Sequence, residues 1–467
     1  MKSSLKYICI LFLLTIIACK KDSPITDPSA KLEFSTDTVL FDTVFTTIGS
    51  TTYYLKVYNR NKKMINISYI HLAGGSNSRF RMNVDGIPTN YLTDVEIAAQ
   101  DSMYIFVEVT IDQTSGTLPF IVSDSIVFLT NNNIQDVKLV AWGQDAHFYN
   151  GNTICDETWI NDKPYVIYNS ILVDSSCTLT IEEGVSIYSH NYSGLFVKGT
   201  LLVNGTMDEP VTFQGDRLES FYDDVPGQWL GIFILRNSDN NTSIIGHTII
   251  KNALYGVSAG SQANTDLNSF TWDNHPEVLL NNTIIQNMSV TGIFGFLSSI
   301  QAVNCLVFNC GEQNAQLVFG GYYDFNHVTL ANYGTSIIEH KDAILQLGNF
   351  AENDLVHISA DLDATFTNCI IYGSIDDEID LNDDQLAQFN YLFENCLLKT
   401  TNNTSVTNYI SIINNQDPLF VDITEDDYHL QSTSPCIDAG KPTSVTDDLE
   451  ENLRDGVPDI GAYEYIP

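Results

Sequence analysis

An acid-rich stretch between residues 376 and 384 contains the side chains of this sequence best suited to binding a cation. Clustered carboxylates match the preference of calcium for oxygen ligands, although the stretch lacks the glycine and the spacing of an EF-hand loop. A solvated acidic loop is therefore the alternative reading. We expect the protein to need no cofactor, with calcium the one ion worth testing. The metal candidates are Asp376, Asp377, Asp380, Asp383 and Asp384.

Aromatic side chains in or beside polar loops form a second set of candidates, because exposed rings can stack on the faces of sugars. The alternative for each ring is that it packs against the base of its own loop. The candidates for ligand binding are Tyr222, Trp229, Trp272, His275, Tyr322 and Tyr323.

No set of residues dictates a catalytic reaction. A lyase for uronates needs a strong base, yet Arg217 and Arg236 are the only arginines between residues 150 and 440. An inverting hydrolase needs two carboxylates roughly 6.5 to 9.5 Å apart, and the sequence does not show which ones would meet. We expect ligand binding rather than catalysis, with a polysaccharide-degrading hydrolase or lyase as the alternative. A structural envelope or adhesion component with a protein partner is the third possibility.

A repeated pattern must position these side chains. Five copies of an asparagine or histidine followed by Thr or Cys and two aliphatic residues begin at His247, Asn282, Asn304, Asn368 and Asn395. A degenerate sixth copy begins at Asn326. The unit is about 22 residues with insertions, which is a solenoid period, and its β-branched core leaves no room for a helix.

These features predict a parallel β-helix. Equivalent residues of successive coils would stack about 4.8 Å apart, with the asparagines tolerating the left-handed bend between strands. The asparagine column is thus expected to be a turn ladder, although some of its members could face a ligand. By the same stacking, Cys305, Cys369 and Cys396 share one repeat position and are expected to be buried.

The N-terminus resembles the export signal of a bacterial lipoprotein. Lys2 and Lys6 precede an apolar run, and residues 16–19, Ile-Ile-Ala-Cys, resemble a lipobox. This resemblance implies a signal peptide at 1–18, lipid on Cys19 and a tether at 19–31. Residues 20–22, Lys-Lys-Asp, resemble the start of Bacteroidota surface lipoproteins, which implies a place on the cell outer membrane, exposed at the surface.

Residues 32–146 differ from the repeats in having alternating strand patterns separated by polar turns. About seven such strands predict an antiparallel sandwich. The opening Phe34-Ser35-Thr36 and the closing Leu139-Val140-Ala141-Trp142-Gly143 resemble immunoglobulin-like domains of the hydin and choice-of-anchor type. The fold class we expect is all-β, with this sandwich followed by a right-handed parallel β-helix.

Two further segments carry a family resemblance. Residues 179–185, Leu-Thr-Ile-Glu-Glu-Gly-Val, and 227–232, Gly-Gln-Trp-Leu-Gly-Ile, resemble the opening coils of bacterial surface β-helix proteins. Residues 459–464, Asp-Ile-Gly-Ala-Tyr-Glu, resemble the C-terminal segment of choice-of-anchor Q proteins. The resemblance implies a right-handed β-helix over 147–440 and a C-terminal cap over 441–467.

Charge and cysteine content limit the partners and the compartment. The formal net charge is −37, from 58 acidic and 21 basic residues, so nucleic acid is excluded as a partner and the membrane is reached only through the lipid on Cys19. A glycan or a surface protein fits better. Cys155 and Cys177 flank the start of the repeats and could form a disulfide, as an exported protein permits.

Overall fold

The computed structural model describes residues 23–46, 49–112, 120–236, 242–260, 275–352 and 357–467. The chain divides into two compact units, Met1–Asp145 and Ala146–Pro467. The predicted signal peptide, Cys19 and Trp272 lie outside the described residues. None of the described helices is long and apolar enough to cross a membrane.

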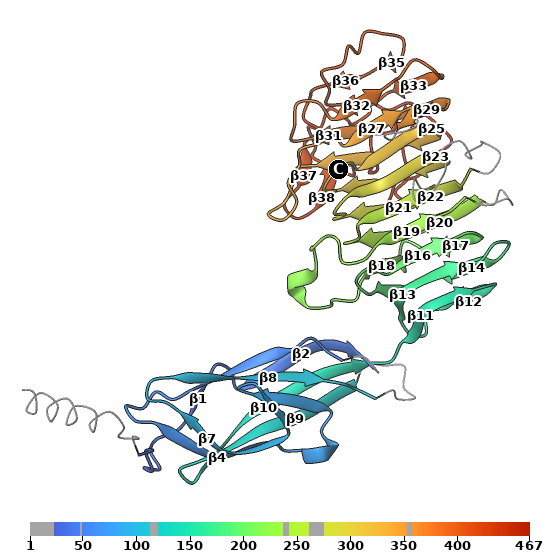
Figure 1. Cartoon of the computed structure of the whole chain (residues 1–467). Coiled ribbons are helices and arrows are strands. Elements are labelled where there is room, and N and C mark those ends of the chain that lie inside the picture. The colour runs from blue at the N-terminus through green and yellow to red at the C-terminus, as the bar shows by residue number, and fades with distance from the viewer. Residues whose placement is uncertain (1–22, 47–48, 113–119, 237–241, 261–274, 353–356) are drawn as a thin grey trace, which may run out of the picture. The chain divides into compact units, whose positions relative to one another are not determined.

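The first unit is a β-sandwich (Figure 1), antiparallel as predicted except that strand Thr38–Phe45 pairs in parallel with strand Asn133–Gln144. Over its described residues it has ten strands in two five-stranded sheets, rather than about seven strands, and alternate side chains from both sheets form one apolar core. A short 3₁₀ helix, η1 (Gly75–Asn77), precedes β5. One sheet has the order β1 (Glu33–Phe34), β3 (Tyr53–Tyr58), β8 (Ser102–Val109), β5 (Phe80–Val84), β6 (Ile87–Thr89), and the other β2 (Thr38–Phe45), β10 (Asn133–Gln144), β9 (Phe120–Thr130), β4 (Ile65–Leu72), β7 (Tyr91–Ile97).

The second unit is a parallel β-helix, as the repeats predict (Figure 1). Its 24 described strands pair with the next coil in parallel register, and aliphatic side chains fill the interior. A 3₁₀ turn, η2 (Ser220–Tyr222), and an antiparallel hairpin of β28 (Phe350–Glu352) and β29 (His357–Ser359) stand out from the coils. The coil strands are β11 (His147–Ile154), β12 (Glu157–Trp159), β13 (Tyr165–Val173), β14 (Thr178–Glu182), β15 (Ser186–Ser189), β16 (Gly194–Val197), β17 (Thr200–Asn204), β18 (Val211–Gly215), β19 (Gly231–Ile234), β20 (Thr242–Lys251), β21 (Tyr255–Ala259), β22 (Glu277–Gln286), β23 (Thr291–Val303), β24 (Leu306–Phe308), β25 (Ala315–Asn326), β26 (Thr329–Asn332), β27 (Leu345–Gly348), β30 (Leu362–Thr367), β31 (Ile370–Gly373), β32 (Ile379–Asn382), β33 (Phe389–Glu394), β34 (Leu397–Leu398), β35 (Tyr409–Ile410) and β36 (Ile413–Asn414).

The asparagine column forms the predicted turn ladder. Its members have left-handed backbone, for example Asn304 at φ 50° and Asn368 at φ 54°. The sixth copy was misread by one residue, because the register pairs Val303 with Asn326. His327, at φ 55°, therefore stands in the column where asparagine was expected at 326.

Two predictions about cysteines can be read from the structure. Cys155 and Cys177 form a disulfide with a Cα–Cα distance of 4.8 Å, linking residues 22 apart near the first coil. Cys305, Cys369 and Cys396 are buried free thiols stacked in the core. Burial raises the pKa of the Cys305 thiol to about 12, so it behaves as a small apolar side chain.

Residues 417–467, which we call the strap, lie along the side of the coils, although a cap was expected over 441–467. The strap contains β37 (Phe420–Asp422) and β38 (Asp427–Leu430) and packs apolar side chains against the outside of β24, β26, β31 and β34. The asparagine column fastens it to the coils by hydrogen bonds. The side-chain amides donate from Asn282 to Asp448 O (3.1 Å), from Asn304 to Asp447 O (3.0 Å), from Asn368 to Lys441 O (2.8 Å) and from Asn395 to Ala439 O (3.0 Å).

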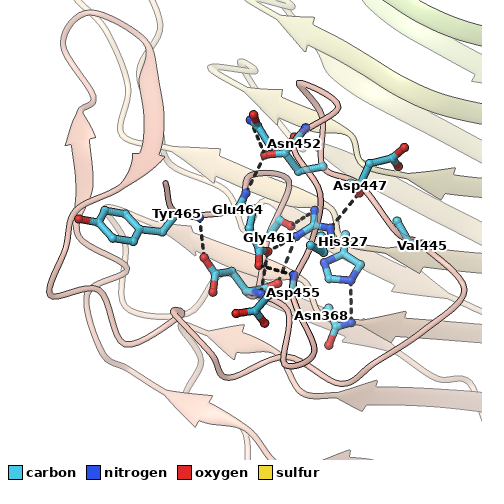
Figure 2. A network of polar contacts seen from close by, with 12 residues as sticks. His327, Asn368, Val445, Asp447, Asn452, Asp455, Gly461, Glu464 and Tyr465 are labelled. Atoms are coloured by element: carbon cyan, nitrogen blue, oxygen red, sulfur yellow. Dashed lines mark hydrogen bonds and ion pairs between the residues drawn. The ribbon is translucent and has the colours of Figure 1, made fainter. Parts of the chain in front are cut away.

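A buried arginine, Arg454, holds the strap in shape. Figure 2 shows the polar network of this part of the strap, with Asp447, Gly461 and Glu464 labelled. Arg454 pairs with Glu464 at 3.1 Å, and both side chains are almost fully buried. Its guanidinium also donates to Asn304 Oδ1 (3.2 Å) and to the carbonyls of Gly461 (3.1 Å) and Asp447 (2.9 Å). A buried charge persists only when it is paired and hydrogen-bonded in this way. The Glu464 carboxylate thus serves the strap's own structure.

Candidate functional site

A row of outward-facing side chains runs along one sheet of the β-helix. Each member lies five residues before a member of the asparagine column, so the repeat places them one above another. We call this row the outer ladder. In coil order it contains Thr242, Glu277, Ser299, Tyr322, Asp363 and Asn390.

A groove of about 540 Å³ lies beside the outer ladder, where the hairpin of β28 and β29 stands next to it. This volume lies within the range of small-molecule sites. Tyr322, Asp363 and Asn390 line one side of the groove, and Ile358 and Ser359 of the hairpin line the other. The remaining lining residues are Leu297, Phe319, Gly321, Ala360, Asp361, Leu362 and Gln388.

The backbone beneath the groove is bent sharply to make room for the hairpin. Leu297 and Phe319 turn the corner between two sheets with φ of 44° and 57°, and Phe319 packs beneath the hairpin with Ala351. A Cβ on Gly320 would lie 2.5 Å from the carbonyl oxygen of Asp361. Glycine is therefore needed where the hairpin's return crosses the coil.

The acidic stretch anchors the hairpin rather than gathering round a metal. The Asp384 carboxylate accepts hydrogen bonds from Ser359 and from His357, whose Nε2 lies 2.8 Å away. Burial alone would raise the pKa of Asp384, but these hydrogen bonds lower it overall. Asp383 accepts one from Asn349 at 2.8 Å. Both carboxylates therefore hold the wall of the groove in place.

Charge inside the groove is modest and negative. Burial, followed by the charges of Asp324 and Asp363, raises the pKa of Tyr322, so its hydroxyl stays a neutral donor at physiological pH. Asp361 already accepts a hydrogen bond from the backbone N–H of Gln388 at 2.9 Å. Asp363 is exposed beside Tyr322 and Asn390 in the ladder.

This arrangement can bind a small polar ligand with an apolar face. Tyr322 is 41% exposed and offers a ring, while Asp363, Gln388 and Asn390 offer hydrogen-bonding groups around it. Glycoside hydrolysis requires two carboxylates in defined separate roles. The groove contains two exposed carboxylates, Asp361 and Asp363, of which Asp361 accepts a backbone hydrogen bond from Gln388.

The structure separates the aromatic candidates. The prediction that Trp229 and Tyr323 bind ligand was wrong, because both rings are fully buried. The Trp229 indole N–H donates to Lys251 O at 2.9 Å, and the Tyr323 hydroxyl donates to Gly320 O at 2.9 Å. Tyr222 is half-buried with the Arg217 guanidinium 4.0 Å from its ring centre. His275 Nε2 lies 3.3 Å from the Glu277 carboxylate. Tyr322 alone of the described candidates lines the groove.

The acidic candidates do not form a metal site. Among the described residues, no group of three or more His, Cys, Asp or Glu side chains could hold a metal ion. Residues close in sequence point to different neighbours: Asp377 accepts from the hydroxyls of Thr400 and Thr401, and Asp380 accepts from Gln346 at 2.8 Å. Asp376 is exposed.

Asp361, Asp363, Gln388 and Asn390 are groove residues that the sequence reasoning missed. For two of them a signal was available, because Asp363 and Asn390 stand at the same offset from the asparagine column as Tyr322. For Ile358 and Ser359 no signal was available. Their place depends on how an insertion folds back onto the coils, which the repeat pattern does not encode.

Comparison with known proteins supports the β-helix. Residues 151–269 match the family described as pectate-lyase like beta helix domain. This segment covers the opening coils, and every groove residue lies beyond it. No curated protein matches the sequence.

Solved structures give weak likenesses. They include a family 123 glycoside hydrolase from Clostridium perfringens (9% identity over 24% of this chain and 26% of that chain, TM-score 0.18) and the PapD-like domain 7 of human CEP192 (12%, 27% and 94%, TM-score 0.17). The DNA glycosylase AlkC from Pseudomonas fluorescens has 8% identity over 24% of this chain and 30% of that one, with a TM-score of 0.16. This chain thus spans about a quarter of the hydrolase. Such scores support no inference about activity, and what the family match does show is that residues 151–269 are similar to a pectate-lyase-like β-helix domain.

Proposed function

We propose that this protein binds a glycan through the groove beside the outer ladder, and that it does so without cleaving the chain. The observation that carries the proposal is the combination of one exposed ring, Tyr322, with polar groups of Asp363, Gln388 and Asn390 in a groove of about 540 Å³. An apolar face surrounded by a few convergent polar groups is what a pyranose requires.

The ligand class we propose is a neutral glycan. Residues 146–467 contain 44 Asp and Glu against nine Lys and Arg, and two of the acids, Asp361 and Asp363, line the groove. A uronate chain, such as the pectate named in the family description, would be repelled by this surplus of like charge. The family match supports the fold, while the charge argues against that substrate.

The cellular setting is part of the proposal. The resemblance of residues 16–19 to a lipobox supports a lipid on Cys19 and a place on the outer membrane, facing outward, with the immunoglobulin-like unit as the membrane-proximal part. No metal is required in this account. Accessibility of the folded units to protease added to intact cells would test the surface location.

A glycan array tests the binding function. The full-length chain in detergent would be screened against neutral and uronate oligosaccharides, once with calcium and once with chelator, and each hit would be incubated with the protein and analysed for shortened products. We expect neutral hits that survive both the chelator and the incubation. Shortened products would replace this proposal with the hydrolase or lyase, with Asp363 as the first residue to substitute. An array without hits would favour a protein partner or a structural role.

A further inference from the structure

The N-terminal sandwich has a sheet face whose exposed side chains are aromatic. In the sheet of β1, β3, β8, β5 and β6, the inward residues Leu55 and Val107 are fully buried, as alternation requires. The outward residues Tyr54, Tyr104 and Phe106 are 61%, 41% and 42% exposed. Large rings with this exposure stand out on a surface where apolar groups are usually scattered singly.

The three rings form a continuous row. Tyr54 stands directly across from Phe106 in the register of β3 and β8. The ring centres of Tyr54 and Tyr104 are 5.6 Å apart, and those of Tyr104 and Phe106 are 6.2 Å apart with their planes only 19° from parallel. Lys56 Nζ lies 5.0 Å from the Tyr104 ring centre. The row is therefore a fixed platform on regular strands.

A groove of about 780 Å³ adjoins this platform and shares Phe106 with it. Its lining combines planar hydrogen-bonding groups with apolar ones: Arg81, Asn83, Pro88, Asn90 and Glu108. It is larger than the groove of the β-helix. Rings that lead into a polar hollow match what a carbohydrate chain needs, namely a flat apolar surface and a set of directional polar contacts.

Charges on this face are balanced. Arg60 pairs with Glu33 at 3.0 Å. Arg81 stands directly across from Glu108 in the register of β5 and β8. This local balance contrasts with the acidic excess of residues 146–467, and it gives an anionic or a cationic ligand little electrostatic gain.

We propose that this face is a second glycan-binding site, which takes a neutral oligosaccharide stacked on Tyr54, Tyr104 and Phe106 with its polar groups bonded in the adjoining groove. A protein partner or a second copy of this chain fits less well, because interface cores are depleted of charge and Lys56, Arg81 and Glu108 lie among the rings. The site stands on its own observations and does not depend on the β-helix groove.

Paired variants of the full-length chain test the inference. Tyr104→Ala with Phe106→Ala removes the platform, Tyr322→Ala disables the β-helix groove, and Tyr91→Ala changes an exposed tyrosine on the opposite sheet as the matched control. The probe is the set of neutral oligosaccharides of the array, with uronate oligosaccharides as the second arm, measured by titration calorimetry. Thermal unfolding and size-exclusion chromatography check that each variant is folded, and Tyr54→Ala is a milder substitute should the double variant unfold.

We expect Tyr322→Ala to retain binding of neutral oligosaccharides at the platform. Adding Tyr104→Ala and Phe106→Ala to Tyr322→Ala should weaken that remaining affinity at least tenfold, whereas Tyr91→Ala should leave the affinity unchanged. Neutral binding that disappears with Tyr322→Ala alone would overturn this site and leave the β-helix groove standing. Binding that depends only on the platform would support this site and overturn the groove. Preference for uronates, or a dimer that the platform variant dissociates, would overturn the proposed ligand.

Discussion

Two polar rows on the β-helix arise from the same repeat, but one is covered by the strap and the other lies partly exposed in a groove. In each of the six coils that contain the outer ladder, its member lies five residues before a member of the asparagine column. Along the column, the amides of Asn282, Asn304, Asn368 and Asn395 all donate to strap carbonyls. Along the ladder, Tyr322, Asp363 and Asn390 are exposed in a groove. A recurring polar residue is thus structural where it bonds to the strap, and a candidate for ligand binding where it is exposed in a groove.

The strap side depends most on Arg454. Replacing it with alanine leaves Glu464 buried without its partner, so we expect a loss of about 3–5 kcal/mol in the free energy of unfolding, measured by urea denaturation. Lys441→Ala, which removes a half-exposed pair with Glu394 at 2.8 Å, is the control and should cost under about 1 kcal/mol. Equal losses for the two variants would show that the strap is not held by its buried arginine.

Substituting one asparagine from each row tests the difference between the column and the outer ladder. Asn368→Ala removes the side-chain amide, which accepts a hydrogen bond from Lys441 N (2.7 Å) and donates one to Lys441 O (2.8 Å). It also places alanine, which disfavours the left-handed region more than asparagine does, at φ 54°. We expect a loss of about 2–3 kcal/mol of stability. Asn390→Ala, in the outer ladder, should stay within about 0.5 kcal/mol. If both asparagines cost the same in urea unfolding, the contrast between the rows fails.

Stability of the strap should also depend on pH through Asp459. Burial, despite hydrogen bonds from the N–H groups of Tyr465 and Asp438, raises its pKa from 3.8 to about 6. The folded state therefore binds the proton more tightly than the unfolded state. Stability from this group is present below about pH 4 and is lost as the pH rises through 6, by on the order of 2 kcal/mol. Asp459→Asn should flatten that part of the profile of unfolding free energy between pH 4 and 7, and an unchanged slope would refute the linkage.

The sequence predicts the scaffold well because packing repeats in it. The period, the β-branched core and the asparagine offset are local features, so the coils and the turn ladder follow from them. Side-chain direction is also partly available. Tyr322 and Tyr323 are consecutive on β25, so only one of them can face outward, and alternation with the buried Phe325 identifies Tyr322 as that one.

The groove could not be predicted from the sequence in the same way. Its second wall comes from the hairpin of β28 and β29, whose position depends on contacts of Ser359 and His357 with Asp384, 25 and 27 residues away. The acidic stretch was a candidate cation site because its long-range contacts are likewise invisible in the sequence. Proximity in sequence made its carboxylates appear to share one ligand, whereas in the fold they face different neighbours, such as Thr400 for Asp377 and Gln346 for Asp380.

The most direct test of the glycan-binding groove is the affinity of Tyr322→Ala for a neutral oligosaccharide hit, measured by titration calorimetry beside Tyr192→Ala. Tyr192 is an exposed tyrosine on the β-helix outside the groove and serves as the matched control. With both variants folded, we predict that Tyr322→Ala raises the Kd of the β-helix site about tenfold, which is roughly 1.4 kcal/mol of binding free energy. Tyr192→Ala should leave this Kd unchanged. Unchanged affinity and stoichiometry in Tyr322→Ala would contradict the account, because the glycan would then bind without the one ring that the groove exposes.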